Sequence, residues 1–355
     1  MQSIESYRKE IDAIDDQILA LLNSRMKVVK AIGQLKQTMG TAIYRPEREK
    51  EILDRLKLLN DGPLDAQAID AIFLEVFAVS RNLEFAEKVA YLGPEGSYTH
   101  QVAESRFGAM GSYLSLSSIE AVFRALEHKE AKYGVVPVEN NTEGAVGTTL
   151  DCLGKFGAKI VAEIYMDIHH SFATVCENVK HLKRIYSHPQ AYNQCRRFLE
   201  EHMLFGIEFI PTKSTAEAAQ KALMDEESAA ICSHIAAKLV NLPILFEKIE
   251  DNMANRTRFL ILSDFKNKQG ADSKTSVWAK IDNTPGSLVA FLQSFQTQNV
   301  NLTKIESRPA KEEGFKSVFY LDFEGHIDDE NVQKVIQTNQ ERCDIKWLGS
   351  YICGE

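Results

Sequence analysis

The sequence predicts a multidomain chain with an all-helical region over residues 1–88, an α/β region over 89–270 and an α+β region over 271–355. Three observations carry this prediction. Apolar residues recur at helical spacing through most of the first region. Short apolar strands alternate with amphipathic helices in the second, and two helices are set among four strands in the third. A length of 355 residues with 44% hydrophobic content suffices to bury the cores of two or three domains.

Composition limits the partners of the chain. The formal net charge of -9 argues against nucleic acid, so an anionic substrate must be held by locally placed cations. No apolar run approaches the roughly 20 residues needed to span a bilayer, and the polar start resembles no signal peptide. The six cysteines are scattered, without a Cys-x-x-Cys pair or a histidine at zinc spacing. We therefore expect a cytoplasmic protein with no membrane contact and no structural metal.

The first region is predicted to hold three helices. One helix of about ten turns follows from the spacing of its apolar residues, which are Ile4, Tyr7, Ile11, Ile14, Ile18, Leu21, Leu22, Val28, Val29, Ile32 and Leu35. Pro46 suits the first turn of a second helix that runs to Leu59, and Asp65 can cap a third that reaches about Phe85. A first helix this long has little core of its own and is expected to pair with a second copy.

Cations on the helices point to more than pairing. Arg25 and Lys36 are eleven residues apart, so they share a face and lie roughly 16 Å apart along the axis. Arg8 lies seventeen residues before Arg25, off that face, and must come from a partner subunit to join the same site. The alternative is a coiled-coil dimeriser without chemistry. The other helices add four polar candidates, namely Arg48, Glu49, Ser80 and Glu84.

In order and spacing these residues resemble the all-helical chorismate mutases, intertwined helical dimers with two shared active sites. The resemblance implies that Arg25, with Arg8 of the other subunit, holds the substrate carboxylates, while Lys36 hydrogen-bonds the ether oxygen. Arg48, Glu49 and Ser80 would complete the pocket. A Claisen rearrangement needs only a folded substrate and positive potential where charge gathers on the breaking C–O bond. An ionised Glu84 would repel that charge, so we expect this side chain to act in its protonated form.

The α/β region contains a stretch around which the rest is organised, residues 255–262. Its second half predicts a buried strand, and its first half sets Thr257 between Arg256 and Arg258 at the strand mouth. A hydroxyl flanked by cations suits a carboxylated substrate with a leaving hydroxyl group. The alternative is an ordinary strand start with surface arginines. The strands predicted in this region are 89–92, 133–138, 159–163, 184–186, 207–210, 229–232 and 259–262.

Three polar loops follow predicted strands, over residues 92–100, 135–144 and 186–195. Ligands of open α/β sheets bind at such strand ends. Together with Thr257-Arg258-Phe259, these loops resemble those of prephenate dehydratases, whose two α/β lobes flank a cleft as in periplasmic binding proteins. The resemblance implies that Thr257 is the catalytic hydroxyl. The side chains it places along the cleft are Asn140, Ser187, Gln194 and Arg258, with Ser97, Thr99 and Ser214 as less certain carboxylate contacts.

The implied reaction removes the ring hydroxyl and carbon dioxide of prephenate together, so the enzyme must help hydroxide leave as water. Thr257 is expected to relay a proton or to hydrogen-bond the leaving oxygen, because a free alkoxide is too basic to remain. His188 and Glu139 are alternative donors, although His188 before a proline is typical of a turn and Ser214 has the spacing of a helix cap. No net redox change occurs and no dinucleotide motif is present, so no cofactor is expected.

The last region follows a polar linker over residues 266–273 and has the βαββαβ order of a ferredoxin-like layout. Residues 283–288 (Asn-Thr-Pro-Gly-Ser-Leu) and 306–309 (Glu-Ser-Arg-Pro) resemble motifs of the ACT regulatory domains, which bind phenylalanine between paired copies. The candidate allosteric residues are Gly286, Ser287, Leu288, Glu306, Ser307 and Arg308. A glycine lets the backbone approach a ligand, and a helix start can face its carboxylate. The alternative is a structural dimer module.

The favoured interpretation is a bifunctional enzyme that converts chorismate to prephenate and prephenate to phenylpyruvate, is inhibited by L-phenylalanine and forms a homo-oligomer, either dimer or tetramer. One alternative is an amino-acid-responsive binding protein without catalysis. Another is a dehydratase whose helical region only dimerises. Thr257 argues against the first, and the cations Arg8, Arg25, Lys36 and Arg48 argue against the second.

Overall fold

The computed structural model describes residues 3–39, 46–84, 88–108, 111–270, 272–309, 317–340 and 342–354. The chain divides into two compact units. The first comprises Met1–Glu87 with Ser105–Ser112, and the second comprises Lys88–Glu104 with Tyr113–Glu355. Within the described ranges, no helix combines the length and the apolar character needed to cross a membrane.

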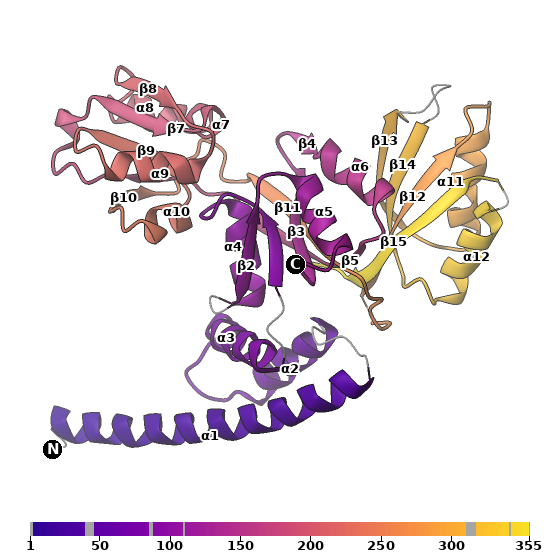
Figure 1. The fold of residues 1–355 in the computed structure, drawn as a ribbon, viewed down its shortest axis with the longest axis horizontal. Coiled ribbons are helices and arrows are strands. Elements are labelled where there is room, and N and C mark those ends of the chain that lie inside the picture. Colours follow the sequence, from indigo (N-terminus) through magenta and orange to yellow (C-terminus); the bar gives the residue numbers. More distant parts are fainter. Residues whose placement is uncertain are drawn as a thin grey trace. The chain divides into compact units, whose positions relative to one another are not determined.

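The first unit contains the three predicted helices, α1 (Ile4–Met39), α2 (Pro46–Leu59) and α3 (Ala66–Glu84) (Figure 1). The predicted cap is confirmed, because the side chain of Asp65 accepts a hydrogen bond from the backbone N–H of Ala68 at 2.7 Å. The buried apolar residues of this unit are few, and α1 contributes Val29 to them. Much of the apolar surface of α1 is exposed, including Ile11 at 56% and Leu21 at 71%.

The first sheet of the second unit has the strand order β2-β1-β3-β11-β5, with a short β4 on β3. Its strands are β1 (Lys88–Leu92), β2 (Ser112–Leu116), β3 (Tyr133–Asn140), β4 (Gly144–Ala145), β5 (Lys159–Asp167) and β11 (Arg256–Ser263). β1 runs parallel to β3, whereas β11 is antiparallel to both β3 and β5. The helices that accompany this sheet are α4 (Tyr98–Phe107), α5 (Ile119–Glu127) and α6 (Gly147–Lys155).

The second sheet has the order β10-β6-β9-β7-β8. Its strands are β6 (Ser171–Ala173), β7 (Arg184–Ser187), β8 (Glu208–Pro211), β9 (Ser228–Cys232) and β10 (Ile244–Glu247). Its helices are η1 (Val179–His181), α7 (Pro189–Asn193), α8 (Arg196–Glu201), α9 (Thr215–Leu223) and α10 (His234–Leu239). Alternate residues of β9 pack into different cores, Ile231 with α8 and Ala230 with α9. Helices therefore cover both faces of this sheet.

All seven strands predicted for the α/β region are present, but β2, β4, β6 and β10 were not predicted. These four are two to five residues long, and apolar runs that short, such as residues 244–246 of β10, do not distinguish a strand from other structure. The chain crosses from the first sheet to the second over residues 168–170 and returns over residues 248–255. These two connectors join the two lobes.

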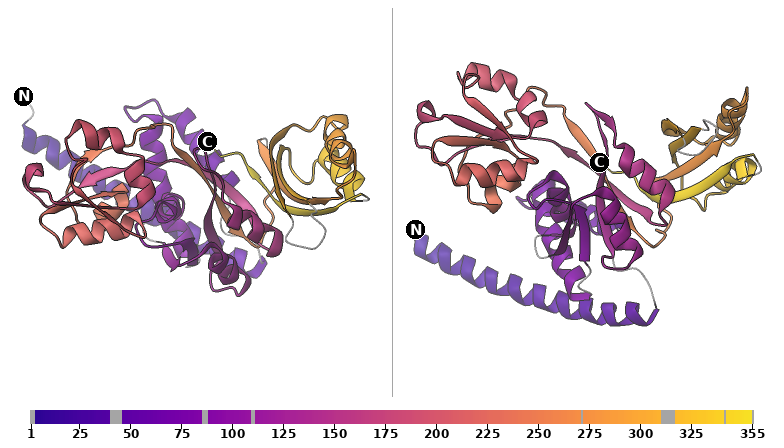
Figure 2. Two further views of the ribbon diagram at one scale, coloured as in Figure 1. Left: turned by 90° about the horizontal axis from the view of Figure 1, so that it is seen from above. Right: turned by 45° about the horizontal axis from the view of Figure 1, so that its top comes forward.

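The C-terminal part forms a four-stranded antiparallel sheet of order β13-β14-β12-β15, which confirms the predicted βαββαβ layout. Its elements are β12 (Ser273–Ile281), α11 (Ser287–Thr297), β13 (Leu302–Pro309), β14 (Ser317–Glu324), α12 (Glu330–Gln340) and β15 (Asp344–Ile352). Both helices lie on one face of this sheet (Figure 2), where Phe295 and Val335 pack against Phe323.

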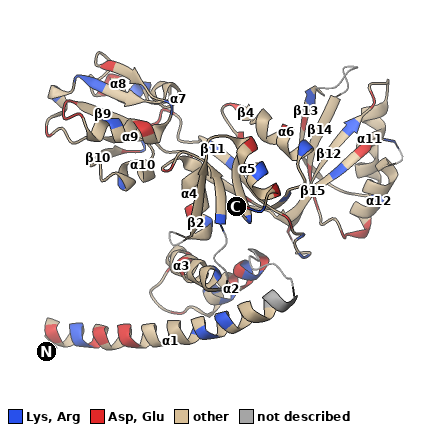
Figure 3. Ribbon diagram, viewed as in Figure 1, with Lys and Arg blue, Asp and Glu red and all other residues tan. Residues whose placement is uncertain are grey.

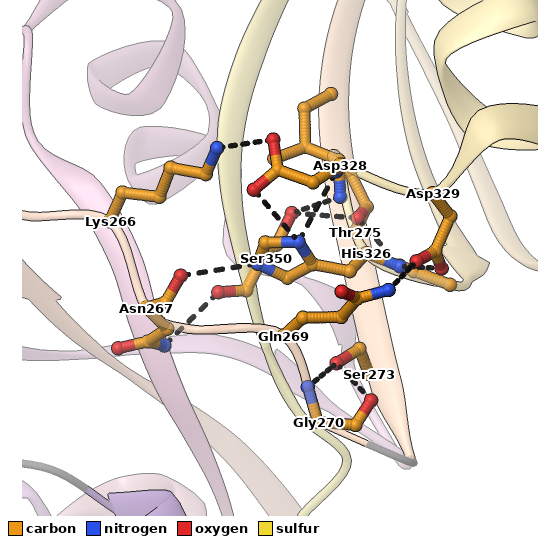
Figure 4. A network of polar contacts seen from close by, with 12 residues as sticks. Lys266, Asn267, Gln269, Gly270, Ser273, Thr275, His326, Asp328, Asp329 and Ser350 are labelled. Atoms are coloured by element: carbon orange, nitrogen blue, oxygen red, sulfur yellow. Dashed lines mark hydrogen bonds and ion pairs between the residues drawn. The ribbon is translucent and has the colours of Figure 1, made fainter.

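The segment between β11 and β12, predicted to be a linker, is fastened to the sheets on either side of it (Figure 4). Lys266 forms an ion pair with Asp328 at 2.5 Å. The buried amide of Asn267 donates to the carbonyl oxygens of Val161 at 2.7 Å and of Ser350 at 3.0 Å. Because its polar groups are bound on both sides, this segment is not a free tether between the two sheets.

Candidate active site

Strand β11 begins at Arg256, so Thr257 and Arg258 both lie inside the strand rather than at its mouth. Across the sheet, Thr257 is paired with Asn140 of β3, and Arg258 is paired with Glu139. Neighbouring residues of a strand point to opposite faces. Thr257 and Asn140 therefore share one face of the sheet, and Arg258 and Glu139 share the other.

A hydrogen bond joins the two residues of the first pair. The amide nitrogen of Asn140 donates to the hydroxyl oxygen of Thr257 at 2.7 Å and to the side-chain oxygen of Asn255 at 2.9 Å. The side-chain oxygen of Asn140 accepts from the backbone N–H groups of Thr142 at 2.9 Å and Glu143 at 3.2 Å. Since a backbone N–H can only donate, these contacts fix the orientation of the amide. In the described part of the chain, no acceptor takes the hydroxyl proton of Thr257.

Gln194 and His170 extend this polar cluster. The side-chain oxygen of Gln194 lies 3.5 Å from the amide nitrogen of Asn255 and 2.8 Å from Nε2 of His170. The other ring nitrogen of His170 lies 2.8 Å from the hydroxyl of Tyr98. Burial lowers the pKa of His170 and raises the pKa of Tyr98, so the imidazole is neutral and the phenol protonated near pH 7. His170 thus links Tyr98 to Gln194 as an uncharged bridge.

Glu250 ties together the two connectors between the lobes. One carboxylate oxygen lies 2.6 Å from Nδ1 of His169, and the other accepts the backbone N–H of His170 at 2.9 Å. The histidines belong to the outgoing connector, whereas Glu250 and Asn255 belong to the returning one. The polar cluster therefore lies where the two lobes join, beside the ends of β3 and β11, which is where open α/β folds commonly bind ligands.

The structure brings together three of the predicted site residues, Thr257, Asn140 and Gln194. The sequence interpretation missed five members of the cluster, which are Tyr98, His169, His170, Glu250 and Asn255. Two signals were present in the sequence. A histidine doublet, His169-His170, follows the predicted strand 159–163 after five residues, and an asparagine lies two residues before Thr257.

The structure corrects the prediction that Arg258 lines the cleft beside Thr257. The Arg258 side chain is 5% exposed and forms ion pairs with Glu163 at 2.7 Å and Asp322 at 2.6 Å. Arg256 is half-exposed and lies 5.0 Å over the ring of Tyr165. The alternation of a strand thus separates two guanidinium groups from the hydroxyl that they flank in sequence.

The predicted hydroxyls of the second lobe make local contacts. Ser187, at the end of β7, is buried and donates to the carbonyl of His188 at 3.0 Å. His188 caps α7 by accepting the backbone N–H of Gln190 at 3.3 Å. Ser214 caps α9 by accepting the N–H of Glu217 at 3.1 Å, which is the structural alternative considered for it.

The loop after β1 shows the same pattern. Ser97 donates to the carbonyl oxygen of Leu92 at 3.0 Å and accepts the N–H of His100 at 3.3 Å. Thr99 is buried with 5% of its surface exposed. The hydroxyl of Ser97 therefore holds the start of α4 in place.

In the helical unit, α1 and α3 bring two predicted residues together, because the guanidinium of Arg25 donates to the hydroxyl of Ser80. Arg25 also lies 5.7 Å over the ring of Phe77. Glu49 forms a buried ion pair with Arg81, a partner that the sequence interpretation missed. The side chains of Lys36 and Glu84 lie outside the described residues.

The other two predicted cations of this unit are exposed. Arg48 pairs with Glu51 at 2.8 Å, and Arg8 lies 3.8 Å from Glu5 with 71% of its side chain exposed. Arg8 and Arg25 lie seventeen residues apart on one continuous helix, which separates them by roughly 25 Å. A single chain therefore does not bring Arg8 to Arg25.

The start of α11 borders a cavity of about 430 Å³. Gly286 and Ser287 line it, and Gly286 adopts a φ of 87°, a backbone conformation that favours glycine. Asn339 also lines it, and the buried side-chain oxygen of this residue has no hydrogen-bond partner within the described ranges. Leu288 packs against the core of the C-terminal sheet instead.

The second predicted allosteric motif lies elsewhere. Glu306, Ser307 and Arg308 belong to β13, the edge strand of the C-terminal sheet. Arg308 forms an ion pair with Asp151 of α6 at 3.2 Å. One copy of the chain therefore does not bring these three residues to the cavity beside α11.

Comparisons with known proteins match the helical region and the α/β region of the chain to two different enzyme families. A chorismate mutase type II family model matches residues 7–85, and a prephenate dehydratase family model matches residues 89–267. A bifunctional chorismate mutase/prephenate dehydratase of Aquifex aeolicus is 40% identical over 356 residues, which cover 99% of this chain and 98% of that relative. The corresponding protein of Pseudomonas aeruginosa is 38% identical, with 98% and 97% covered.

A solved structure shares the architecture of the second unit. The prephenate dehydratase of Arthrobacter aurescens, determined in complex with L-Phe, is 29% identical and superimposes with a TM-score of 0.69. The match covers 75% of this chain and 90% of that protein.

Proposed function

The chain belongs to the family of bifunctional chorismate mutase/prephenate dehydratases, and we propose that Thr257 and Asn140 form the centre of its dehydratase site. It is an enzyme of phenylalanine biosynthesis with two activities, the conversion of chorismate to prephenate and of prephenate to phenylpyruvate. The observation that supports this site is the 2.7 Å hydrogen bond from the Asn140 amide to the Thr257 hydroxyl oxygen at the junction of the lobes.

In the proposed dehydratase mechanism, Thr257 hydrogen-bonds the departing ring hydroxyl of prephenate. Its oxygen already accepts from Asn140, so its own proton points to another acceptor, and the leaving oxygen takes that place. As the proton shifts towards the leaving group, the Asn140 N–H stabilises the charge that gathers on the Thr257 oxygen. Thr257 shares or relays the proton and is not left as a free alkoxide.

Two further side chains belong to the proposed dehydratase site. Gln194 and Asn255 lie next to the Thr257 pair and offer amide groups to the polar substituents of prephenate. The neutral His170 holds Gln194 from behind. Ser187 stays a predicted contact at the end of β7, and Arg258 is left out.

For the mutase site, the proposal combines residues of two copies. Arg25, held by Ser80, binds a substrate carboxylate, and Arg8 of a second copy binds the other. Lys36 donates to the ether oxygen, and a protonated Glu84 assists it. Arg48 and Glu49 border the pocket, with Glu49 oriented by Arg81.

Helix α1 supports a homo-oligomer. It exposes a long apolar stripe that includes Ile14 at 48%, Ile18 at 49% and Leu35 at 62%. Acidic residues prevail in its first half and basic residues in its second (Figure 3). Two antiparallel copies of α1 would bury the stripe and set acidic halves against basic halves. We propose a dimer or a higher oligomer built on this pair.

The C-terminal region is proposed to be an ACT regulatory domain over residues 271–355, after the mutase domain over 1–88 and the dehydratase domain over 89–270. L-Phenylalanine, which the Arthrobacter aurescens relative binds, would occupy the cavity beside α11 and inhibit the enzyme. Its carboxylate would face the start of α11, and the unpartnered oxygen of Asn339 would accept its ammonium group. Glu306 and Ser307, on the edge strand β13, are available to a second copy.

We further propose a cytoplasmic location, in keeping with six free cysteines.

Phenylpyruvate formation at neutral pH tests these assignments. It is measured from chorismate and, separately, from prephenate, with and without phenylalanine, and with a neutral quench because acid aromatises prephenate. A Thr257→Val variant should still form prephenate from chorismate while its conversion of prephenate is lost. Unchanged dehydratase activity of this variant would refute the proposed centre.

A further inference from the structure

Behind the Thr257 pair, the opposite face of the same sheet carries two charges. Arg258 and Glu139 are cross-strand partners there, one step along β11 and β3 from Thr257 and Asn140. The C-terminal sheet presents a matching pair, because Lys304 of β13 and Asp322 of β14 are also cross-strand partners. We call Glu139, Arg258, Lys304 and Asp322 the charge quartet.

The two pairs meet with opposite charges facing each other. Arg258 lies 2.6 Å from the carboxylate of Asp322, and Lys304 forms an ion pair with Glu139. The side chains are shielded from solvent to different degrees, from 5% exposure for Arg258 and 11% for Asp322 to 17% for Lys304 and 37% for Glu139. Because both of its side chains are nearly buried, the Arg258–Asp322 pair is screened only weakly by salt.

Further contacts hold the quartet in one arrangement. The guanidinium of Arg258 also donates to Glu163 of β5 at 2.8 Å and to the hydroxyl of Tyr351 at 3.0 Å. Glu163 in turn binds Lys274 of β12 at 2.6 Å. Burial opposes the charge of Arg258, but Tyr351, Asp322 and Glu163 raise its pKa. A buried charge that loses a partner is strongly disfavoured, so β11 and the C-terminal sheet are bound to move together.

From this geometry we propose that the charge quartet positions the Thr257–Asn140 pair and transmits conformational changes of the C-terminal sheet to the dehydratase site. Arg258 and Glu139 are positioning residues, because they lie on the face away from Thr257 and act through the backbone of β11 and β3. Consecutive Cα atoms are only about 3.8 Å apart, so a shift of the quartet displaces the Thr257 hydroxyl directly. The regulatory part of this inference rests on the proposed inhibition by phenylalanine, whereas the positioning part does not.

The Lys304–Glu139 pair offers a charge-removal test in the full-length enzyme. Lys304→Glu sets a new carboxylate against both Glu139 and Asp322, whereas Glu139→Gln combined with Lys304→Gln replaces the ion pair by two amides and creates no like-charge contact. The matched control is the exposed pair of Lys334 and Glu330 on α12, 2.7 Å apart, with the variants Lys334→Glu and Glu330→Gln/Lys334→Gln. For each protein, kcat and KM for prephenate, phenylalanine binding by calorimetry, inhibition by phenylalanine and thermal unfolding are measured.

We expect Lys304→Glu to lower kcat for prephenate about tenfold with little change in KM, and the double amide variant to recover it to within about threefold. Phenylalanine should still bind Lys304→Glu but inhibit it at least tenfold more weakly, and the double amide variant should restore inhibition. The α12 variants should match the unmodified enzyme. If Lys304→Glu folds poorly, Asp322→Asn takes its place in the test. This variant keeps the size of the side chain and should lower kcat and inhibition in the same way.

Two results would overturn the proposal. One is a Lys304→Glu or Asp322→Asn enzyme that is folded and has normal kcat and normal inhibition. The other is a double amide variant that recovers no activity although its unfolding temperature is normal. If the unmodified enzyme neither binds phenylalanine nor is inhibited by it, the proposed regulation is wrong. The kcat values of the quartet variants then still show whether the quartet positions Thr257 and Asn140.

Discussion

Replacement of Asn140 by aspartate tests the role of the N–H donor of this side chain. The substitution preserves shape and keeps an oxygen to accept the backbone N–H groups of Thr142 and Glu143. It removes the N–H that Thr257 accepts at 2.7 Å. The new carboxylate also offers an acceptor to the hydroxyl proton of Thr257, which diverts that proton from the leaving group of prephenate.

The substitution loses two hydrogen bonds, one to Thr257 and one to Asn255 at 2.9 Å. The effect on kcat follows from the bond to Thr257, at a site with little solvent. Thr257 is 7% exposed. Loss of a hydrogen bond to a buried group costs about 1–3 kcal/mol, which corresponds to roughly 5- to 150-fold in kcat. Because the diverted proton adds to the loss, we expect the upper part of this range for Asn140→Asp.

The assay is the rate of phenylpyruvate formation from prephenate at neutral pH, with mutase activity of the same protein as an internal control. Asn241→Asp makes the same chemical change at an exposed turn and should leave both activities unaltered. A value of kcat for Asn140→Asp within twofold of the unmodified enzyme would show that Thr257 does not depend on this hydrogen bond.

Three further predictions concern both active sites. Thr257→Ser should keep dehydratase kcat within about tenfold, whereas Thr257→Val should lose about 10²–10⁴-fold in steady-state assays, and equal rates for the two would exclude a hydroxyl role. Glu49→Gln removes the carboxylate that pairs with the buried Arg81 and should destabilise the helical unit by about 1–3 kcal/mol in denaturant unfolding. The exposed Glu51→Gln should not, and equal stability of both variants would contradict the reasoning. Mutase activity should fall as pH rises, because only the protonated Glu84 side chain can assist the ether oxygen, while Glu84→Gln should give a flat profile. Parallel profiles would refute a protonated Glu84.

Local sequence was sufficient for most elements of the fold. The apolar spacing of residues 4–39 and the cap at Asp65 depend on contacts within a few residues, which the order of residues contains directly. The βαββαβ order of the C-terminal region could be predicted for the same reason. The short strands β6 and β10 were missed because they are stabilised by strands distant in sequence.

The sequence also indicated the chemistry of the dehydratase site. The motifs containing Asn140, Gln194 and Thr257 identified three side chains of the polar cluster, although Asn140 and Thr257 are 117 residues apart. The partners from the connectors, His170 and Glu250, belong to no such motif. Their roles follow from the two crossings between the lobes, which no local pattern specifies.

Only the tertiary structure decided the role of Arg258. In sequence it is the neighbour of Thr257, and its charge suits an anionic substrate equally well. The register of β11 against β3 and β5 places the two side chains on opposite faces, and the C-terminal sheet supplies Asp322 and Tyr351 on the far side. Residue types thus determined what chemistry this chain can perform, whereas strand register and long-range packing decided which charges face the substrate, because both depend on residues far apart in the sequence.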